Sequence, residues 1–546
     1  MKKFYSLLLL AMAALTPAHA QWNTNATPVC IYSTTYVDEN GETKTGGDYF
    51  ACSPLVARTP DKKTWISWKT WGHKYIGDVR VSAVRTYLQL LDRDGVPQFE
   101  EPILVNDHIT PTWWSKYALC VASDGSAIVT VSDSRTEDES YAGDSNSSPQ
   151  TFTPAIYKID QEGNFLWGLD GIEFTDQTNS PFTNAYVVGD DTFFLFIVQA
   201  DMDEDTSADG IYMIRIDDDG TLGWDEPKKM ASGVTTKGQI LPSTNGEFLY
   251  FDDTPDGARV RRFDRDLNEV WGEPLIYDDY YYTGYEMNHY RLTPDGEGGA
   301  CVAFLRVMGQ FSHNIRVQHI NGDGSLGFGL TGLDAYNAEE YDHNYPSIAA
   351  NPETGQIFVM FASQLAGTGN VMSQLFTFDG DYLFDEKGLS LASKDANTNA
   401  YFYGLRGCGA TPDGDWITVF TDISAHSRSS IIIRRYKSDG TRVWTRTIGR
   451  DIDPTDMNVV VEKEATYLFY REYREGKNPG INIFRIGHDG GYNVEYAEED
   501  AITSVEEKVS GSAGFFTIDG KHLSAPQQGL NIVRRADGTV SKHIVK

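Results

Sequence analysis

Cysteine is scarce in this chain, and basic residues are far outnumbered by acidic ones. The five cysteines are an odd number with no two adjacent, which excludes a disulfide framework, although Cys30 and Cys52 could still pair. With 46 Lys and Arg against 78 Asp and Glu, the net charge of −32 argues against nucleic acid and anionic membrane surfaces as partners. Beyond the first residues, no apolar run reaches the ~18 residues that a transmembrane segment needs.

The N-terminus carries the features of a secretory signal peptide. Two lysines precede an apolar run, and the small-residue cleavage site Ala18-His19-Ala20 follows it. Cleavage would leave Gln21 as the first residue of the mature chain, with no cysteine there to receive a lipid anchor. We expect residues 1–20 to be removed and the mature protein to be exported, to the extracellular space or to the outer-membrane surface.

A hairpin pattern with an acidic turn recurs along the chain. One copy reads IYKIDQEGNFLWG, in which apolar residues alternate up to the turn, a glycine follows, and a tryptophan comes four residues later. The turn positions are Gly95, Gly163, Gly220, Leu267, Gly324, Gly380, Gly440 and Gly490. The aromatics four residues on are Phe99, Trp167, Trp224, Trp271, Phe328, Phe384 and Trp444. Steps of 47 to 68 residues between copies are typical of a repeat architecture.

A second turn, rich in Pro, Asp and Gly, precedes each of these hairpins, as in TPDGDWITVF. Its flanking β-branched and aromatic residues suit strands, so each unit holds four short strands. This predicts an all-β chain that forms an eight-bladed β-propeller of four-stranded blades, or seven blades if the weak last unit only closes the ring. We place an N-terminal segment at residues 21–45, the propeller at 46–500, and a linker with a short β tail at 501–546. The aromatic after each turn is expected as a wedge buried between blades.

The spacing of Asp, Gly and Trp in IDQEGNFLW resembles the tryptophan-docking repeat of the pyrroloquinoline-quinone-type eight-bladed propellers. The resemblance implies the fold alone. Those enzymes carry a vicinal cysteine pair that this chain lacks, so no quinone or other cofactor is expected.

The C-terminal residues resemble the sorting region of the type IX secretion system of Bacteroidota. The matching features are Ile518-Asp519-Gly520-Lys521, Pro526, Gly529-Leu530-Asn531-Ile532-Val533 and the closing KHIVK. The resemblance implies recognition by that secretion machinery and delivery to the cell surface, although the proline-containing front half of the usual domain is missing. The alternative is a final hairpin that caps the propeller.

Both repeated turns of a blade lie on one face of a propeller, here named the turn face, and the irregular connections gather on the opposite loop face. These connections, among which we count Lys69–Tyr75, are rich in Tyr, Trp, Asp and His. Such side chains stack on sugar rings or partner side chains and fix their orientation. Elements such as Asn184-Ala-Tyr186 either belong to this set or begin an innermost strand. The candidate binding residues are Trp113, Trp114, Asp278, Asp279, Tyr280, Tyr281, Tyr282, Tyr341, Asp342 and His343.

These features favour a binding protein whose ligand is a glycan or a partner protein, held in a concave aromatic and acidic pocket around the central channel. The alternative is a glycoside hydrolase that uses two carboxylates of the same face, about 5 to 9.5 Å apart. We assign no catalytic residue and no metal ligand. The run Asp201–Asp205 begins like a calcium loop, yet lacks the glycine at its sixth position and the closing Glu.

Overall fold

The chain folds into two compact units, Met1–Val494 and Glu495–Lys546, and the regular structure of their described residues is almost entirely β-strand. The structure is a computed structural model. It describes residues 21–33, 35–37, 43–45, 50–76, 79–108, 116–135, 152–174, 178–180, 182–200, 205–232, 238–254, 257–278, 290–309, 312–336, 342–365, 368–391, 405–424, 428–473, 480–494, 514–516, 522–523, 529–534 and 540–545.

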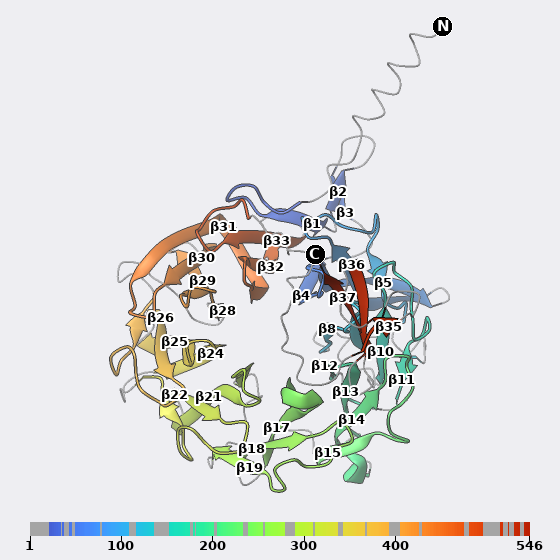
Figure 1. Cartoon of the computed structure of the whole chain (residues 1–546). Coiled ribbons are helices and arrows are strands. Elements are labelled where there is room, and N and C mark those ends of the chain that lie inside the picture. Colours follow the sequence, from blue (N-terminus) through green and yellow to red (C-terminus); the bar gives the residue numbers. More distant parts are fainter. Residues whose placement is uncertain are drawn as a thin grey trace. The chain divides into compact units, whose positions relative to one another are not determined.

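The first unit is an eight-bladed β-propeller with four antiparallel strands in each blade, as the repeat predicts (Figure 1). Blade 1 consists of β4 (Phe50–Arg58), β5 (Thr64–Ile76), β6 (Val79–Leu91) and β7 (Ile103–Leu104). Blade 2 consists of β8 (Leu119–Val121), β9 (Ala127–Asp133), β10 (Thr153–Ile159) and β11 (Ile172–Glu173). Blade 3 consists of β12 (Thr183–Val188), β13 (Asp191–Val198), β14 (Gly210–Ile216) and β15 (Lys228–Ser232). Blade 4 consists of β16 (Gln239–Pro242), β17 (Phe248–Thr254), β18 (Gly257–Phe263) and β19 (Leu275–Asp278). Blade 5 consists of β20 (Arg291–Pro294), β21 (Ala300–Gly309), β22 (Ser312–Ile320) and β23 (Leu333–Asp334). Blade 6 consists of β24 (Asp342–Asn351), β25 (Gln356–Leu365), β26 (Thr368–Thr377) and β27 (Leu389–Ser390).

Blades 7 and 8 share one strand and form a single seven-stranded sheet. The strands are β28 (Leu405–Ala410), β29 (Trp416–Ser424), β30 (Arg428–Tyr436), β31 (Arg442–Val461), β32 (Ala465–Tyr473), β33 (Gly480–Gly487) and β1 (Val29–Ser33). The first half of β31 pairs with β30 as the outer strand of blade 7, and its second half pairs with β32 as the inner strand of blade 8. The N-terminal strand β1 pairs antiparallel with β33 and so completes blade 8.

The remaining strands form two small sheets. β2 (Thr35–Val37) and β3 (Thr43–Thr45) pair with each other as a hairpin. In the second unit, β34 (Gly514–Phe516), β35 (His522–Leu523), β36 (Gly529–Arg534) and β37 (Val540–Val545) form an antiparallel sheet in the order β35-β34-β36-β37. The chain thus ends in the short β tail that its sequence predicts.

The hydrophobic core of the propeller is divided among the seams between neighbouring blades. Middle strands such as β9 and β33 are buried along their whole length, because each blade is covered by another on both faces. In the seam between blades 1 and 2, Trp65 and Leu88 pack with Val129 and Tyr157. Every seam contains such a cluster, and that between blades 8 and 1 includes Trp22.

The aromatic after each turn packs on the turn glycine of the next blade. A Cβ atom at Gly220 would lie 2.7 Å from Trp167, and one at Gly324 would lie 2.9 Å from Trp271. Both glycines have positive φ, so the turn requires glycine for its backbone as well as for this contact. The expected wedge tryptophans Trp167, Trp224, Trp271 and Trp444 lie over the turns, where they are partly buried and pack against the next blade.

The backbone carbonyl two residues before the turn glycine accepts hydrogen bonds from side chains of the preceding blade. The indole N–H of Trp271 donates to Gly322 O at 3.1 Å, and that of Trp444 donates to His488 O at 2.8 Å. A basic side chain from the third strand of the same preceding blade reaches the same oxygen, since Arg262 donates to Gly322 O and Arg435 donates to His488 O. Lys158 and His319 make the corresponding contacts with Asp218 O and Phe378 O.

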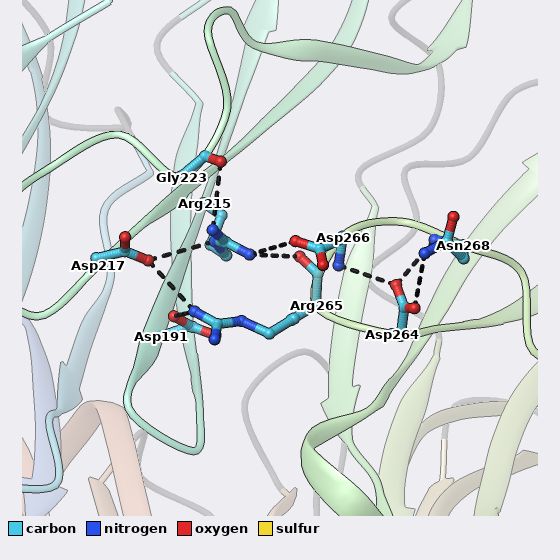
Figure 2. Close-up of polar contacts among 8 residues, drawn as sticks. All are labelled: Asp191, Arg215, Asp217, Gly223, Asp264, Arg265, Asp266 and Asn268. Atoms are coloured by element: carbon cyan, nitrogen blue, oxygen red, sulfur yellow. Dashed lines mark hydrogen bonds and ion pairs between the residues drawn. The ribbon is translucent and has the colours of Figure 1, made fainter.

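The seam between blades 3 and 4 departs from this pattern, because Leu267 replaces the turn glycine with φ +64°. Arg215 donates to Arg265 O at 3.2 Å and pairs with Asp266 at 2.6 Å, while Arg265 pairs with Asp191 at 2.7 Å (Figure 2). Trp224 Nε1 is buried and has no hydrogen-bond partner among the described residues. The Arg265 carbonyl therefore accepts from a guanidinium alone, whereas at other seams the corresponding carbonyl also accepts from an indole.

The ring closes through the same contact, made by the N-terminus. The last unit has Val494 where the others have an aromatic, and Trp22 takes its place. A Cβ atom at Gly95 would lie 2.9 Å from the Trp22 ring, and Trp22 Nε1 donates to Arg93 O at 2.9 Å. Residues 22–33 therefore belong to the propeller.

We expect Gly324→Ala to lower the free energy of unfolding by about 2 to 4 kcal/mol, through backbone strain and collision with Trp271. The matched control is Gly168→Ala, since Gly168 also has positive φ but has no atom within 4 Å of its Cβ position. It should cost only about 1 to 2 kcal/mol. Denaturant unfolding measures both, and equal losses would show that the aromatic contact contributes nothing.

Candidate functional site

The structure describes three of the ten candidate binding residues. Asp278 ends β19 and Asp342 begins β24, so both stand at strand ends on the loop face, and His343 follows. The others lie outside the described residues: Trp113, Trp114, Asp279, Tyr280, Tyr281, Tyr282 and Tyr341.

His343 is completely buried in the seam between blades 5 and 6. Its ring lies edge-on to Tyr336 and Phe361, with centroids 4.7 and 5.2 Å away. Its Nδ1 lies 3.1 Å from Asn314 Oδ1, and the Asn314 amide donates to Asp334 at 2.9 Å. The side chain that the sequence placed in an open connection is therefore packed inside the blades, since aromatic neighbours from two blades enclose it.

Two further expectations about the connections are settled by the strands. Lys69–Tyr75 is not an irregular connection but part of β5, which pairs with β6 from end to end. Asn184 and Tyr186 lie in β12, the innermost strand of blade 3, where Asn184 Nδ2 donates to the Tyr186 hydroxyl at 2.8 Å. Asn184-Ala-Tyr186 is thus a strand element.

Lys69 is a buried lysine in the loop-face half of blade 1. It pairs across the sheet with Cys52, and both residues are 2% exposed. Its Nζ lies 4.7 Å over the ring of Tyr117, whose hydroxyl donates to Ser53 O at 2.6 Å. Burial lowers the pKa of Lys69 to about 7, with a smaller lowering from the nearby Lys116 and an opposing effect of Cys52. At neutral pH this amine is therefore divided between its charged and neutral forms.

A second polar group, the Asp133–Arg135 cluster, stands at the loop-face end of blade 2. Arg135 Nε lies 2.7 Å from Asp133 Oδ1, and its Nη1 lies 2.9 Å from Glu173 Oε1. Asn106, from the connection between blades 1 and 2, donates to Asp133 Oδ2 at 2.8 Å. Burial raises the pKa of Asp133 to about 7, against the lowering effect of Arg135. The cluster therefore ties the entry of the 106–117 connection to the end of β9.

Sequence reasoning missed Asp133 and Arg135, and it placed Lys69 in a connection instead of in a buried strand. Each had a signal, since Lys69 interrupts the apolar stretch WISWKTW, and Asp133 and Arg135 follow the buried strand AIVTV. A charged residue in or beside a continuous apolar run indicates a buried charge once the strand is known to be covered by neighbouring blades on both faces.

The described residues also bear on cysteine, metal and membrane expectations. None of the five cysteines forms a disulfide, so Cys30 and Cys52 are not joined to each other; Cys30 is exposed and Cys52 is buried. Within the described ranges, no group of three or more His, Cys, Asp and Glu could hold a metal ion, and no helix is long and apolar enough to cross a membrane. The first four residues of Asp201–Asp205 lie outside those ranges, and Asp205 caps a short helical turn.

No family model and no curated protein matches the chain. Among solved structures, it is similar to a protein of unknown function from Dyadobacter fermentans DSM 18053, at 12% identity over 86% of this chain and 99% of that chain, with a TM-score of 0.38. An acylaminoacyl peptidase from Pyrococcus horikoshii is 9% identical over 78% and 58% of the two chains, with a TM-score of 0.37. An ulvan lyase, described as a new family of polysaccharide lyase, is 11% identical over 66% and 91%, with a TM-score of 0.37. Similarities at this level leave function to be argued from the residues.

Lys69 predicts a pH dependence of stability. Its folded pKa of about 7 lies below the unfolded value, so above pH 7 the unfolded chain holds a proton that the folded chain has released. The free energy of unfolding of the wild type, taken relative to Lys69→Met, should therefore rise between about pH 7 and pH 10. Lys116→Met, which removes an exposed neighbouring charge, should preserve the rise. Denaturant unfolding across this range measures it, and a flat difference would contradict the assignment.

Proposed function

We propose that this protein is an exported binding protein whose propeller recognises a glycan or a partner protein at its loop face. The observation that carries this proposal is the different use of polar side chains on the two faces. On the turn face, Lys158, Arg262 and Arg435 make one repeated contact that joins neighbouring blades. On the loop face, the buried polar groups differ between blades, with the lysine Lys69 in blade 1 and Asp–Arg clusters in blades 2 and 4.

The loop-face groups follow the repeat only in part, since the Asp252–Arg259 pair of blade 4 is similar to the Asp133–Arg135 cluster of blade 2. The buried Lys69 belongs to blade 1, the Asp133–Arg135 cluster to blade 2, and the His343–Asn314 pair to the seam between blades 5 and 6. Burying charge costs stability unless partners compensate, so buried groups of this kind are candidates for a role beyond packing. Function on a rigid repeat scaffold resides in its irregular connections, and these groups anchor their ends.

The ligand class follows from the candidate side chains and the charge. Tyr and Trp offer flat apolar surfaces to sugar rings or partner side chains, and Asp supplies hydrogen-bond acceptors. Removal of Lys2 and Lys3 with the signal peptide takes the net charge from −32 to −34. A field of this sign suits neutral glycans and basic protein surfaces.

A glycoside hydrolase is the second candidate, and one observation favours it. Asp133, with its pKa raised to about 7, stands near Glu173, and a glycosidase uses one protonated and one ionised carboxyl group. However, the Asp133 side chain is completely buried and engaged by Arg135 and Asn106, so it does not face a substrate. This geometry supports binding over hydrolysis.

A glycan array and a protein pull-down with the purified propeller test the proposal. Replacing Tyr280, Tyr281 and Tyr282 together by Ala should weaken binding about ten-fold or more, because buried aromatics dominate binding energy. Leu169→Ala is the matched control, since Leu169 is an apolar residue 76% exposed in the turn-side segment of blade 2. Turnover of a bound oligosaccharide would establish the hydrolase instead, and an unchanged affinity in the triple variant would remove the loop-face assignment.

The proposed route to the cell surface uses the C-terminal tail. Glu495–Lys546 forms a compact unit with its own sheet, which supports a module that acts separately from the propeller. We assign to it recognition by a type IX secretion machinery.

Deleting Thr503–Lys546 should leave a folded propeller that stays in the periplasm, because the described tail strands pair only with one another. Cell fractionation and thermal unfolding measure the two properties. Normal surface delivery of the truncated chain would exclude a sorting role, and loss of cooperative unfolding would show that the tail caps the propeller.

A further inference from the structure

Cys52 and Lys69 lie directly opposite each other in blade 1, on the neighbouring strands β4 and β5. Opposite side chains of an antiparallel pair project from the same face of the sheet, with Cβ atoms about 4.5 to 5.5 Å apart. Both residues are 2% exposed, so the two side chains share one buried environment. Because lysine has a flexible four-carbon stem, its amine can reach the cysteine sulfur across this separation.

Tyr117 holds the lysine amine close to the strand segment of Cys52. Nζ of Lys69 lies 4.7 Å from the centre of the Tyr117 ring, and the Tyr117 hydroxyl donates to the Ser53 carbonyl at 2.6 Å. Ser53 is the residue after Cys52, so the ring extends from the amine to the backbone beside the thiol. The charges are coupled as well, since Cys52 opposes the lowering of the Lys69 pKa that burial and, to a smaller degree, Lys116 cause.

The other four cysteines have no lysine directly opposite them in the strand pairs that the structure describes. Their cross-strand partners are Asn482 for Cys30, Ile128 for Cys120, Thr293 and His319 for Cys301, and Thr418 for Cys408. Burial raises the pKa of Cys120 and of Cys408 to about 12. These two thiols therefore stay protonated and unreactive, and they serve as internal controls.

We propose that Cys52 and Lys69 form an oxidative modification site, at which a peroxide joins the thiol sulfur to the amine nitrogen through a covalent S–N bond. The inference is independent of the ligand that the loop face binds. Hydrogen peroxide is uncharged and close to water in size, so local opening of the blade admits it to the pair. The new bond ties β4 to β5 and removes the lysine charge from the ring of Tyr117.

The reaction has two balanced steps. The pair reacts as thiolate and ammonium, the form that an ammonium group beside a thiol favours. The sulfur attacks one peroxide oxygen, an S–O bond forms as the O–O bond breaks, and the released hydroxide takes a proton from the ammonium group. The sulfur is thereby oxidised to a sulfenic acid, and the peroxide is reduced to water.

The second step uses the amine that the first step has made neutral. The amine attacks the sulfenic sulfur, the S–N bond forms as the S–O bond breaks, and the leaving hydroxide takes a proton from nitrogen. One thiol, one amine and one hydrogen peroxide thus give one sulfenamide and two molecules of water.

Mass spectrometry of the full chain treated with hydrogen peroxide tests the proposal directly. The cross-link removes two hydrogen atoms, so the intact mass should fall by about 2 Da, and a thiol reductant should restore it. A non-reduced tryptic digest should join the peptides of Cys52 and Lys69, with no cleavage after Lys69. The proposal is overturned if Cys52 stays a thiol, or becomes a sulfinic acid, while Lys69 is unmodified.

Lys69→Arg is the matched variant, because the guanidinium keeps a positive charge beside the sulfur but does not lose a proton to become a nucleophile. In this variant Cys52 should be oxidised without a cross-link, and thermal unfolding verifies that the propeller is folded. Oxidation of Cys120 and Cys408 to the same extent as Cys52, or a cross-link from Cys52 to a different lysine, would contradict the assignment.

The wild type allows a further test that needs no variant. The amount of cross-link relative to sulfinic acid should rise about nine-fold between pH 6 and pH 8, because the neutral fraction of an amine with a pKa of about 7 rises by that factor. The groups around this amine that affect its charge are Cys52 and Lys116, and Tyr117 covers it. A ratio that does not change over this range would show that Lys69 is not the nucleophile.

Discussion

The propeller depends on one contact, made where a blade presents a backbone carbonyl and a bare glycine to its neighbour. The positive φ of glycines such as Gly324 shapes the turn that exposes the carbonyl of Gly322, and the missing side chain makes room for Trp271. Arg262 binds the same oxygen from the third strand of the same blade. Burying the seam cores supplies most of the stability, since apolar area is non-directional, but the turn contact fixes the register at which neighbouring blades meet.

The exception between blades 3 and 4 shows which part of the contact is essential. There Leu267 and Trp224 still pack on the shared core, although the glycine and the indole hydrogen bond are both absent. The Arg215–Asp266 pair is partly exposed, with Asp266 62% accessible, so screening leaves it a small contribution to stability. Apolar coverage of the turn therefore carries the seam, and the acceptor carbonyl can be filled by a guanidinium instead of an indole. This also explains why phenylalanine serves in other blades.

Sequence reasoning recovers the blades because their signal is local, with glycine, aromatic and strand alternation within one hairpin. It does not recover the closure. Val29 pairs with Ile483, which lies at the other end of the propeller sequence, and β1 carries no turn or glycine that marks it as the missing strand. The shared strand β31 escapes for a related reason, since blades 7 and 8 are joined without any turn. The tryptophans are half-buried, and Lys69 and His343 fully buried, because of residues in neighbouring blades. A sequence pattern within one blade holds no information about those contacts. Of the candidate site, the sequence indicates the face and the residue types.

The two faces of the ring therefore carry different constraints. A substitution on the turn face acts on a contact that most blades repeat, so it weakens one of several similar seams. A substitution at Lys69 or Asp133 acts instead on a single buried group, whose pKa burial shifts to about 7. The contacts of Asp133 with Asn106 and of Lys69 with Tyr117 fasten the two described ends of the connection between blades 1 and 2 to the blades. Because several similar seams hold the ring together, the ring tolerates the stability that is lost where charge is buried in one blade.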